Sequence, residues 1–132
     1  MRWPEPGRGP LRVAIVGAES TGKSALAQAL ENRLADEFGL RCASVGEYLR
    51  EWCDARGRTP RPDEQRGIAE EQQRRTEAAA GMPGVDVVIC DTTPLMTAVY
   101  SELLFDDRSL DAFAAEAQRR AHVTLLTALD LP

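Results

Sequence analysis

The chain has 132 residues, of which 43% are hydrophobic and 28% are charged, and its formal net charge is −5. This length suits one domain with one buried core, and the composition is that of a globular chain rather than a disordered one. The negative charge argues against a general nucleic-acid or anionic-membrane binder, and no apolar run reaches the length of a membrane span. We therefore expect a cytoplasmic protein, and the sequence does not indicate its oligomeric state.

The first half of the chain alternates predicted strands and helices. Residues 1–10 contain three prolines and two glycines, a composition that predicts a flexible leader. Residues 12–16 are apolar on both faces, which is typical of a central parallel strand. A helix is predicted over 23–38, and a short strand near 41–45. The large apolar side chains of the helix recur every four residues and are expected to form its buried face: Leu26, Leu30, Leu34 and Phe38.

The second half continues the alternation. Residues 46–57 predict a turn that opens into a helix, and Asp63 is expected to cap a further helix that reaches about Ala80. That helix has few large apolar side chains apart from Ile68, so its polar face is expected to be either solvated or turned toward a ligand cleft. The remaining elements are a strand over 85–90, a helix over 94–105, a helix capped by Ser109 that runs through Arg120, and a strand over 122–127.

Strands that alternate with helices imply right-handed crossovers and a parallel sheet. The predicted fold class is therefore α/β, with helices on both faces of the sheet in three layers. In such sheets, ligands bind outside the carboxyl ends of the strands. The segments that follow the first three strands should therefore gather at one edge.

One of these segments, Gly-Ala-Glu-Ser-Thr-Gly-Lys-Ser at 17–24, matches the phosphate-loop pattern G-x-x-x-x-G-K-[ST] between a strand and a helix. Gly17 and Gly22 allow a tight turn, and successive backbone N–H groups can converge on phosphate oxygens at the positive end of the helix. Lys23 suits the β- and γ-phosphates, and the Ser24 hydroxyl suits Mg²⁺. The structural alternative is an ordinary glycine-rich turn. We predict that ATP is bound by Gly17, Glu19, Ser20, Thr21, Gly22, Lys23, Ser24 and Ala25.

Asp91 directly follows the apolar strand residues before it, where phosphate-loop proteins carry the acid that completes a magnesium site. We therefore predict Ser24 and Asp91 as the residues that hold Mg²⁺. The alternative is a strand-end aspartate that forms a local turn with Thr92 or Thr93.

Glu47 follows the second strand, where an acid can accept the proton of an acceptor hydroxyl or hold the acceptor. A solvated glutamate in a first helical turn is the alternative. Together with Lys23 and Asp91, Glu47 completes the predicted catalytic set. Arg50 lies one turn beyond Glu47 and could pair with it or with a ligand anion. The predicted substrate contacts are Glu47, Arg50, Gln72 and Thr92, with a solvated helix face as the alternative for Gln72.

These residues resemble the ribosylnicotinamide kinase domain of NadR-type proteins and their AAA-like ATPase relatives. The resemblance is carried by the loop at 17–24, Glu-Tyr-Leu-Arg-Glu-Trp at 47–52, the glutamine-bearing helix near 65–73 and Val-Ile-Cys-Asp-Thr at 88–92. In that family, a parallel sheet with helices on both faces supports transfer of the ATP γ-phosphoryl to the 5′-hydroxyl of nicotinamide riboside. The resemblance implies the phosphate and Mg²⁺ roles for Lys23 and Ser24, and the two acidic positions for Asp91 and Glu47.

The chain departs from the family pattern in two places. The family often reads Asp-Thr-Asp where this chain has Asp91-Thr92-Thr93, and it continues beyond Leu-Asp-Leu-Pro into an arginine-bearing lid, a closing strand and a helix. We therefore expect residues 11–132 to be a P-loop nucleotide-binding domain that lacks its last strand and helix. Two functions remain open. One is a kinase that moves phosphate from MgATP to a small nucleoside-like acceptor, and the other is a nucleotide-binding or regulatory ATPase module without kinase turnover.

Overall fold

The computed structural model describes residues 9–18 and 22–127. Most of the predicted leader, the loop residues Glu19, Ser20 and Thr21, and the chain beyond Thr127 lie outside the described residues. The elements in chain order are β1 (Leu11–Val16), α1 (Lys23–Phe38), β2 (Cys42–Val45), α2 (Tyr48–Arg56), the short 3₁₀ turn η1 (Pro62–Glu64), α3 (Gln65–Ala80), β3 (Val87–Asp91), α4 (Pro94–Phe105), α5 (Asp111–Arg119) and β4 (Val123–Leu126).

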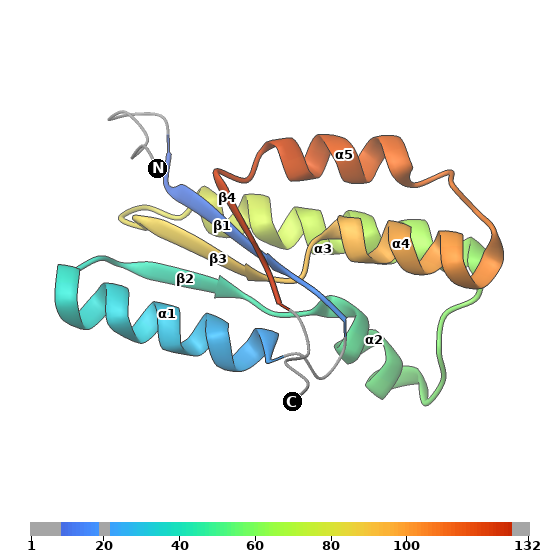
Figure 1. Cartoon of the computed structure of the whole chain (residues 1–132), viewed down its shortest axis with the longest axis horizontal. Helices are drawn as coiled ribbons and strands as arrows, with labels where there is room; N and C mark the ends of the chain where they lie inside the picture. The colour runs from blue at the N-terminus through green and yellow to red at the C-terminus, as the bar shows by residue number, and fades with distance from the viewer. Residues whose placement is uncertain (1–8, 19–21, 128–132) are drawn as a thin grey trace.

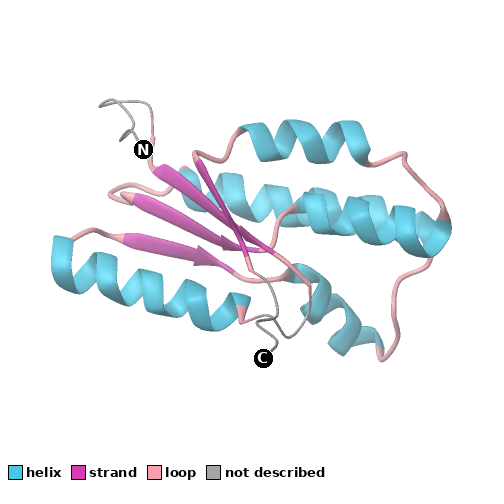
Figure 2. Ribbon diagram, in the orientation of Figure 1, coloured by secondary structure: helices cyan, strands magenta, loops and turns pink. Residues whose placement is uncertain are grey.

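The four strands form one parallel sheet in the order β2-β3-β1-β4 (Figure 1). On one face, Val13 and Ile15 of β1 pack with Val87 and Ile89 of β3 against Ala27 of α1. The opposite face packs against α3, and Figure 2 shows helices on both sides of the strands. The predicted α/β fold, with a parallel sheet covered on both faces, is therefore confirmed.

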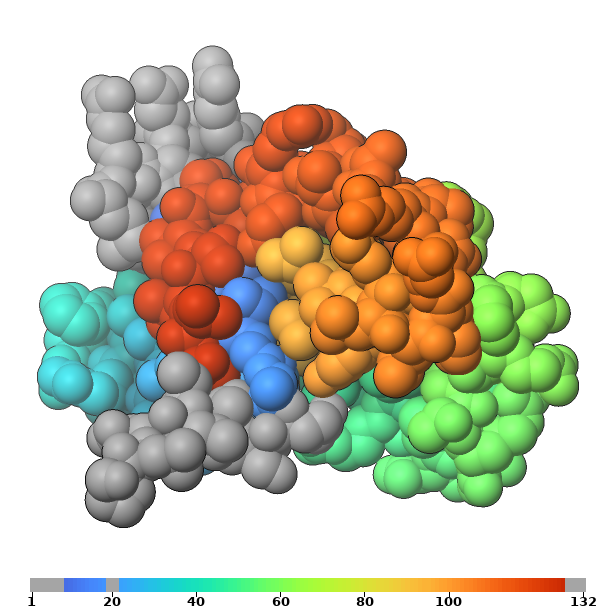
Figure 3. All heavy atoms as spheres, turned by 45° about the vertical axis from the view of Figure 1, so that its right-hand side comes forward, coloured from blue at the N-terminus to red at the C-terminus, as the bar shows by residue number. Residues whose placement is uncertain are grey.

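The second face of the sheet is covered mainly by α3, where Val88 and Cys90 of β3 pack against Ala79. α4 leaves the carboxyl end of β3 and packs on α5 through Ala98 and Ala114, with Leu110 buried between them. Figure 3 shows α4 and α5 side by side as one surface of the molecule. Because α4 lies beyond the strand ends, it forms a wall beside the edge of the sheet where a ligand is expected (Figure 1).

The predicted buried face of α1 is partly wrong. Leu30 and Leu34 pack against the core, but Leu26 is 37% exposed and Phe38 is 67% exposed, while Ala27 is buried. A spacing of four residues advances the side chain about 40° beyond a full turn at each step, so four such residues spread over roughly 120° of the helix. The residues on the core side instead follow the i, i+3, i+7 spacing of a helix face.

Two predicted helix caps are also wrong. Asp63 lies within η1 with its side chain largely exposed, and α3 begins only at Gln65. The Arg61 backbone N–H instead donates to Glu64 Oε1 at 2.8 Å. Ser109 lies before α5, which begins at Asp111 with Leu110 at the cap position. The Ser109 N–H donates to Asp107 Oδ1 at 2.8 Å, so Ser109 belongs to a local turn before the helix.

The polar face of α3 is only partly solvated: Arg66, Glu70 and Arg74 are exposed, whereas other polar side chains of the helix are buried. Its buried side chains include Gln65, Gln72 and Thr76 beside Ile68, because α3 is packed against the sheet, α2 and α4. The sequence did not decide whether the glutamines of this helix face solvent or a cleft, and the structure buries Gln65 and Gln72. None of the described helices combines the length and apolar composition that a membrane span requires.

Candidate nucleotide-binding site

The loop between β1 and α1 has the backbone geometry that its glycines permit. Gly22 has φ 84° and ψ 20°, and Gly17 has φ 152°, values that favour glycine over residues with a Cβ. Gly22 directly precedes Lys23, the first residue of α1, and no side chain caps this helix start. Successive N–H groups at an uncapped helix N-terminus form a site for an anion such as phosphate.

Lys23 is the only lysine in the sequence, which otherwise has arginine as its basic residue. Its side chain is 5% exposed, and its Nζ donates to the Ala18 carbonyl at 3.0 Å. The ammonium is therefore hydrogen-bonded to the first part of the loop. This bond uses one of its three donors, and a phosphate oxygen over the loop could accept from the others.

Ser24 and Asp91 are 67 residues apart in the sequence and in direct contact in the structure. The Ser24 hydroxyl donates to Asp91 Oδ2 at 2.5 Å, and Ser24 is exposed while Asp91 is only 8% exposed. The other carboxylate oxygen, Oδ1, is buried and has no hydrogen-bond partner among the described residues. A buried carboxylate oxygen without a donor suits a cation or a cation-bound water.

This pair fits Mg²⁺ in one particular way. Mg²⁺ usually takes one or two protein oxygens and completes its shell with water and substrate phosphates. Within the described ranges, no cluster of three or more His, Cys, Asp or Glu side chains could hold a metal ion. The residues therefore suit a metal brought with a nucleotide rather than one held by protein ligands alone.

Thr92 has a strained backbone at the edge of the site. Its φ is 86°, a value rare for a β-branched residue, and its N–H donates to the Ile15 carbonyl at 2.9 Å. Its hydroxyl is buried and has no hydrogen-bond partner among the residues described. Thr93 has a different role, because its hydroxyl accepts from the Leu95 N–H at 3.3 Å and donates to Gln118 Oε1 at 2.8 Å. Thr93, which stands where the family often has a second acid, therefore caps α4.

The register of the sheet brings the predicted acids to one edge. Asp91 of β3 lies opposite Ile15 of β1, and Val45 of β2 lies opposite Cys90. Glu47, two residues past Val45, therefore follows the end of β2, the strand that pairs with the strand of Asp91. The expected convergence of the three strand ends is confirmed by this register.

Glu47 lies in a small polar cluster. It is 7% exposed, and its Oε2 lies 3.5 Å from Nη2 of Arg50. Arg50 was predicted to pair either with Glu47 or with a ligand anion, and in the structure it pairs with Glu47. Gln72, which is 2% exposed, accepts from the Tyr48 N–H at 2.8 Å and donates to the Gly46 carbonyl at 3.1 Å. Gln72 thus holds the backbone on both sides of Glu47, and both hydrogen bonds are within the protein.

Comparison with known proteins is decisive at the level of family. A family model described as an AAA domain matches residues 12–131, which is nearly the whole sequence. The chain belongs to this AAA domain family. A stretch of 51 residues is 43% identical to mouse adenylate kinase 9. This match covers 38% of the present chain and 2% of adenylate kinase 9.

Solved structures give the fold of this AAA domain. The crystal structure of NadR protein in complex with NR matches with a TM-score of 0.68 at 22% identity, over 89% of this chain and 33% of that one. A gluconokinase from Sinorhizobium meliloti 1021 aligns over 95% of this chain and 86% of that one at 14% identity, with a TM-score of only 0.39. The chain thus spans about a third of NadR and a small fraction of adenylate kinase 9. The likeness to NadR concerns the fold of the domain.

A pocket of about 480 Å³ opens between α2, the start of α3 and the end of α4, and we call it the α2–α4 pocket. Most of its lining is apolar or aromatic, and its volume is within the range usual for small-molecule sites. Thr59 and Gln65 are the polar residues of the lining, and Gln65 is 4% exposed, with a buried Oε1 that has no hydrogen-bond partner among the described residues. The lining residues are Leu49, Cys53, Thr59, Pro60, Gln65, Tyr100, Leu104 and Phe105.

Sequence reasoning did not single out Gln65 as a site residue. A glutamine in the first turn of a polar helix is usually solvated, but this one is buried on a pocket wall that residues of α2 and α4 also line. The available signal was the excess of glutamine on a helix short of large apolar residues. That signal does not distinguish Gln65, which faces the α2–α4 pocket, from Gln72, which binds the backbone.

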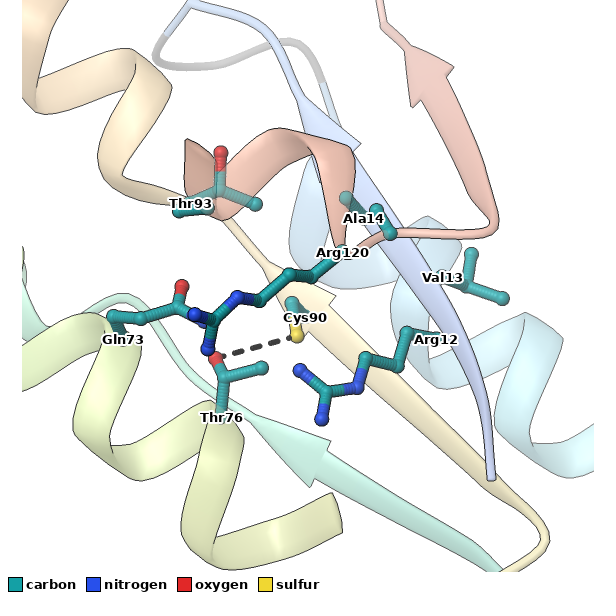
Figure 4. Close-up of a pocket in the computed structure, with 10 residues that line it drawn as sticks. Arg12, Val13, Ala14, Gln73, Thr76, Cys90, Thr93 and Arg120 are labelled. Atoms are coloured by element: carbon teal, nitrogen blue, oxygen red, sulfur yellow. Dashed lines mark hydrogen bonds between the residues drawn. The ribbon is translucent and has the colours of Figure 1, made fainter. Parts of the chain in front are cut away.

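A second cluster of charge lies on the far side of α3 and is structural. Arg12 of β1 makes two hydrogen bonds to the Glu77 carboxylate, at 2.6 and 3.0 Å, and Arg120 adds one at 3.2 Å. The hydrogen bond from Arg12, together with those from Gln73 and Arg120, lowers the pKa of Glu77 to about 2. The cavity beside it has a volume of only about 20 Å³, room for a single water, and Figure 4 shows Arg12 and Arg120 around Thr76 and Cys90.

Proposed function

We propose that this AAA domain binds MgATP at the β1–α1 loop and transfers the γ-phosphoryl group to a small nucleoside-like acceptor. The observation that carries the proposal is the Ser24–Asp91 hydrogen bond beside an uncapped helix start. It joins a hydroxyl and a buried carboxylate, the two oxygen ligands that Mg²⁺ takes from the protein in P-loop enzymes. The predicted catalytic set of Lys23, Glu47 and Asp91 remains part of this proposal.

Each residue has a distinct part in the proposed reaction. Lys23 would donate to the β- and γ-phosphate oxygens and compensate charge that builds up on them. Ser24 and Asp91 would hold Mg²⁺, which when bound neutralises phosphate charge and orients the γ-phosphoryl group. The acceptor hydroxyl oxygen would attack the γ-phosphorus while the bond to the β–γ bridging oxygen breaks, and ADP would leave.

The acceptor would occupy the α2–α4 pocket, because one side of this pocket is lined by α2, the helix that begins directly after Glu47. Leu49 of its lining is two residues from Glu47 along α2. Glu47 would take the proton of the acceptor hydroxyl, Arg50 would orient that carboxylate, and Gln72 would fix the turn that carries it. Thr92, strained and with a buried hydroxyl that lacks a partner, is proposed as a further contact to the acceptor or to the γ-phosphate. Nicotinamide riboside is the acceptor that the family resemblance favours.

The first test uses the single lysine. We expect an amine-acetylating reagent to modify Lys23 and the α-amino group, and saturating MgATP to protect Lys23 alone, as counted by mass spectrometry. Calorimetry should detect MgATP binding that Lys23→Ala reduces by about ten-fold or more, because a direct contact to the phosphates is lost. Wild-type protein that binds no magnesium nucleoside triphosphate would overturn the proposal.

The second test separates the metal role of Asp91 from a structural one. We expect Asp91→Asn to weaken ATP binding by about ten-fold or more in Mg²⁺ and by far less in EDTA, because only the first state uses the carboxylate as a ligand. Asp36→Asn, an exposed change on α1, is the matched control and should alter neither affinity. Equal losses in Mg²⁺ and EDTA would contradict the metal role.

The third test distinguishes a kinase from a binding module. A coupled assay with MgATP and nicotinamide riboside should produce ADP and phosphorylated riboside at a rate that Lys23→Ala abolishes. Binding of MgATP without product from any ribonucleoside would favour the nucleotide-binding or regulatory module. In that case Glu47→Gln should leave ATP affinity and any residual hydrolysis unchanged, whereas in a kinase it should lower kcat.

A further inference from the structure

A chain of side-chain hydrogen bonds connects the segment after β3 to α5 and β4. The Thr93 hydroxyl donates to Gln118 Oε1 at 2.8 Å, and Gln118 Nε2 donates to the Thr124 hydroxyl at 2.7 Å. Gln118 is on the last turn of α5, which leads into β4 (Figure 1), and Thr124 lies on β4 opposite Ala14 of β1. One amide therefore joins α5 and β4 to the residue that caps α4.

The same amide sets the direction of the Thr93 hydroxyl. Because Gln118 Oε1 can only accept, the hydroxyl proton of Thr93 points toward α5, and the oxygen keeps its lone pairs for the Leu95 N–H at 3.3 Å. Thr93 is 8% exposed, so solvent has little access to this hydroxyl. Loss of the Gln118 amide would therefore leave a nearly buried hydroxyl without the acceptor that it has in the structure.

The residue before Thr93 needs support on both sides. Thr92 has φ 86°, and a β-branched residue held in this region costs about 1–3 kcal/mol, so the conformation persists only where the surrounding structure imposes it. On the N-terminal side, Asp91 pairs with Ile15 in the sheet, and the Thr92 N–H donates to the Ile15 carbonyl at 2.9 Å. On the C-terminal side, Thr93 is held by the α4 cap and by its bond to Gln118.

This support lies next to the proposed metal site, and the inference rests on the proposed function. We infer that Gln118 is a positioning residue for that site and acts through the backbone between Asp91 and Thr93. Asp91 Oδ1 and the Thr92 hydroxyl are both buried without a hydrogen-bond partner among the described residues, so their use by a ligand depends on where this backbone places them. Relaxation of Thr92 to a negative φ would move its hydroxyl and loosen the peptide link to Asp91, so both oxygens would lose a defined position.

The test measures ATP binding in Mg²⁺ and in EDTA, by calorimetry with the full chain. Gln118→Met keeps the length of the side chain and removes its amide. It should lower the affinity in Mg²⁺ by about three- to ten-fold and the affinity in EDTA by less than about two-fold, a smaller effect than the loss of a direct partner of a metal ligand. Gln118→Asn has an amide that is one methylene too short to reach both hydroxyls, so it should give the same loss, and it replaces Gln118→Met if circular dichroism shows that variant to be unfolded.

Glu116→Gln on the same helix is the matched control, because its side chain is exposed and bonds to Arg119 on the surface. It should leave the ratio of the affinities in Mg²⁺ and EDTA at the wild-type value. A double mutant tests the route through Thr93. Thr93→Ala alone should lower the ratio, and adding Gln118→Met should lower it by no more than about two-fold further, because two residues that act through one interaction are not additive.

A structural role for Gln118 would appear as a lower melting temperature with an unchanged ratio, and that result would overturn the inference. Equal losses in Mg²⁺ and EDTA, or fully additive losses in the double mutant, would also overturn it. These outcomes are separable from failure of the proposed function. MgATP binding that Asp91→Asn weakens, but that the Gln118 variants leave unchanged, would remove the positioning role and keep the metal site. Wild-type protein that binds no MgATP would overturn both.

Discussion

Replacing Gln72 with leucine tests whether α3 holds the segment that carries Glu47. The change removes the acceptor for the Tyr48 N–H and the donor to the Gly46 carbonyl, and both backbone groups are in the part-buried interior. A buried polar group that loses its partner costs about 1–3 kcal/mol, and leucine regains some of this loss by burying apolar surface. We therefore expect Gln72→Leu to lower the free energy of unfolding by roughly 2–4 kcal/mol.

Urea denaturation at neutral pH, followed by circular dichroism, measures this change. For a slope of about 2 kcal/mol per molar urea, the midpoint should fall by roughly 1–2 M with the slope unchanged. Gln28→Leu is the control, because Gln28 is exposed on α1 and bonds only to Asn32 nearby, so its effect should stay within about 0.5 kcal/mol. If Gln72→Leu unfolds at the same midpoint as Gln28→Leu, the hydrogen bonds to residues 46 and 48 do not hold the turn, and the reasoning fails.

Three further changes test the rest of the structure by the same measurement. The lowered pKa of Glu77, about 2 against an ordinary 4.5, stabilises the fold above pH 4.5, and this stabilisation is lost as pH falls toward 2. Because the side chain is 37% exposed, we expect the stabilisation to be roughly 1–2 kcal/mol. Glu77→Gln should flatten the dependence of stability on pH between about 5 and 3, whereas an unchanged slope would contradict the ion cluster. Thr93→Ala should cost about 1–3 kcal/mol, because it removes the α4 cap and the donor to Gln118 Oε1, and Thr93→Ser should retain both hydrogen bonds, while equal losses in both would argue against these roles of the hydroxyl. Phe38→Ser should change stability by no more than about 0.5 kcal/mol, because the ring is 67% exposed, and a loss near 3 kcal/mol would mean that the ring is covered.

The sequence was sufficient for the fold because its local signals agree with the tertiary structure. The apolar run that became β1 is buried along nearly its whole length, and α1 has the predicted bounds, Lys23–Phe38, with Gly39 in the left-handed conformation at its end. Strands and helices alternate in the predicted order, and that order alone implies a parallel sheet. The fold therefore follows from the hydrophobic periodicity of the elements and from the residues that end them.

The errors occur where a neighbouring element decides the outcome. A sequence cannot show which side of α1 meets the sheet, so Leu26 and Leu30 looked equivalent although only the latter packs in the core. Asp63 and Ser109 are residue types that often cap helices, but neither caps one here. The backbone N–H groups of Arg61 and Ser109 donate instead to the carboxylates of Glu64 and Asp107. The burial of Gln65 required the position of α4, which no local pattern contains.

The candidate site divides in the same way. The spacing of the loop at 17–24 is a local signal, and its described glycines have the expected backbone angles. The contact between Ser24 and Asp91 depends on the pairing of β1 with β3, which a parallel sheet with these strand ends makes predictable. All of the predicted ligand roles remain predictions. They comprise the nucleotide contacts of Gly17, Glu19, Ser20, Thr21, Gly22, Lys23, Ser24 and Ala25, the metal roles of Ser24 and Asp91, the catalytic roles of Lys23, Glu47 and Asp91, and the substrate roles of Glu47, Arg50, Gln72 and Thr92.

α3 connects these observations, because its buried polar side chains face three different parts of the molecule. Gln65 faces the α2–α4 pocket, Gln72 holds the turn before α2, and Glu77 binds Arg12 at the start of β1. An apolar helix of the same length would bury more hydrophobic surface and would be expected to stabilise the sheet at least as well. It would not hold the Glu47 turn by hydrogen bonds, so stability alone does not account for the glutamines. The composition of α3 is better explained by the positions of Glu47 and of the pocket wall, and Gln72→Leu tests the first of these two positions.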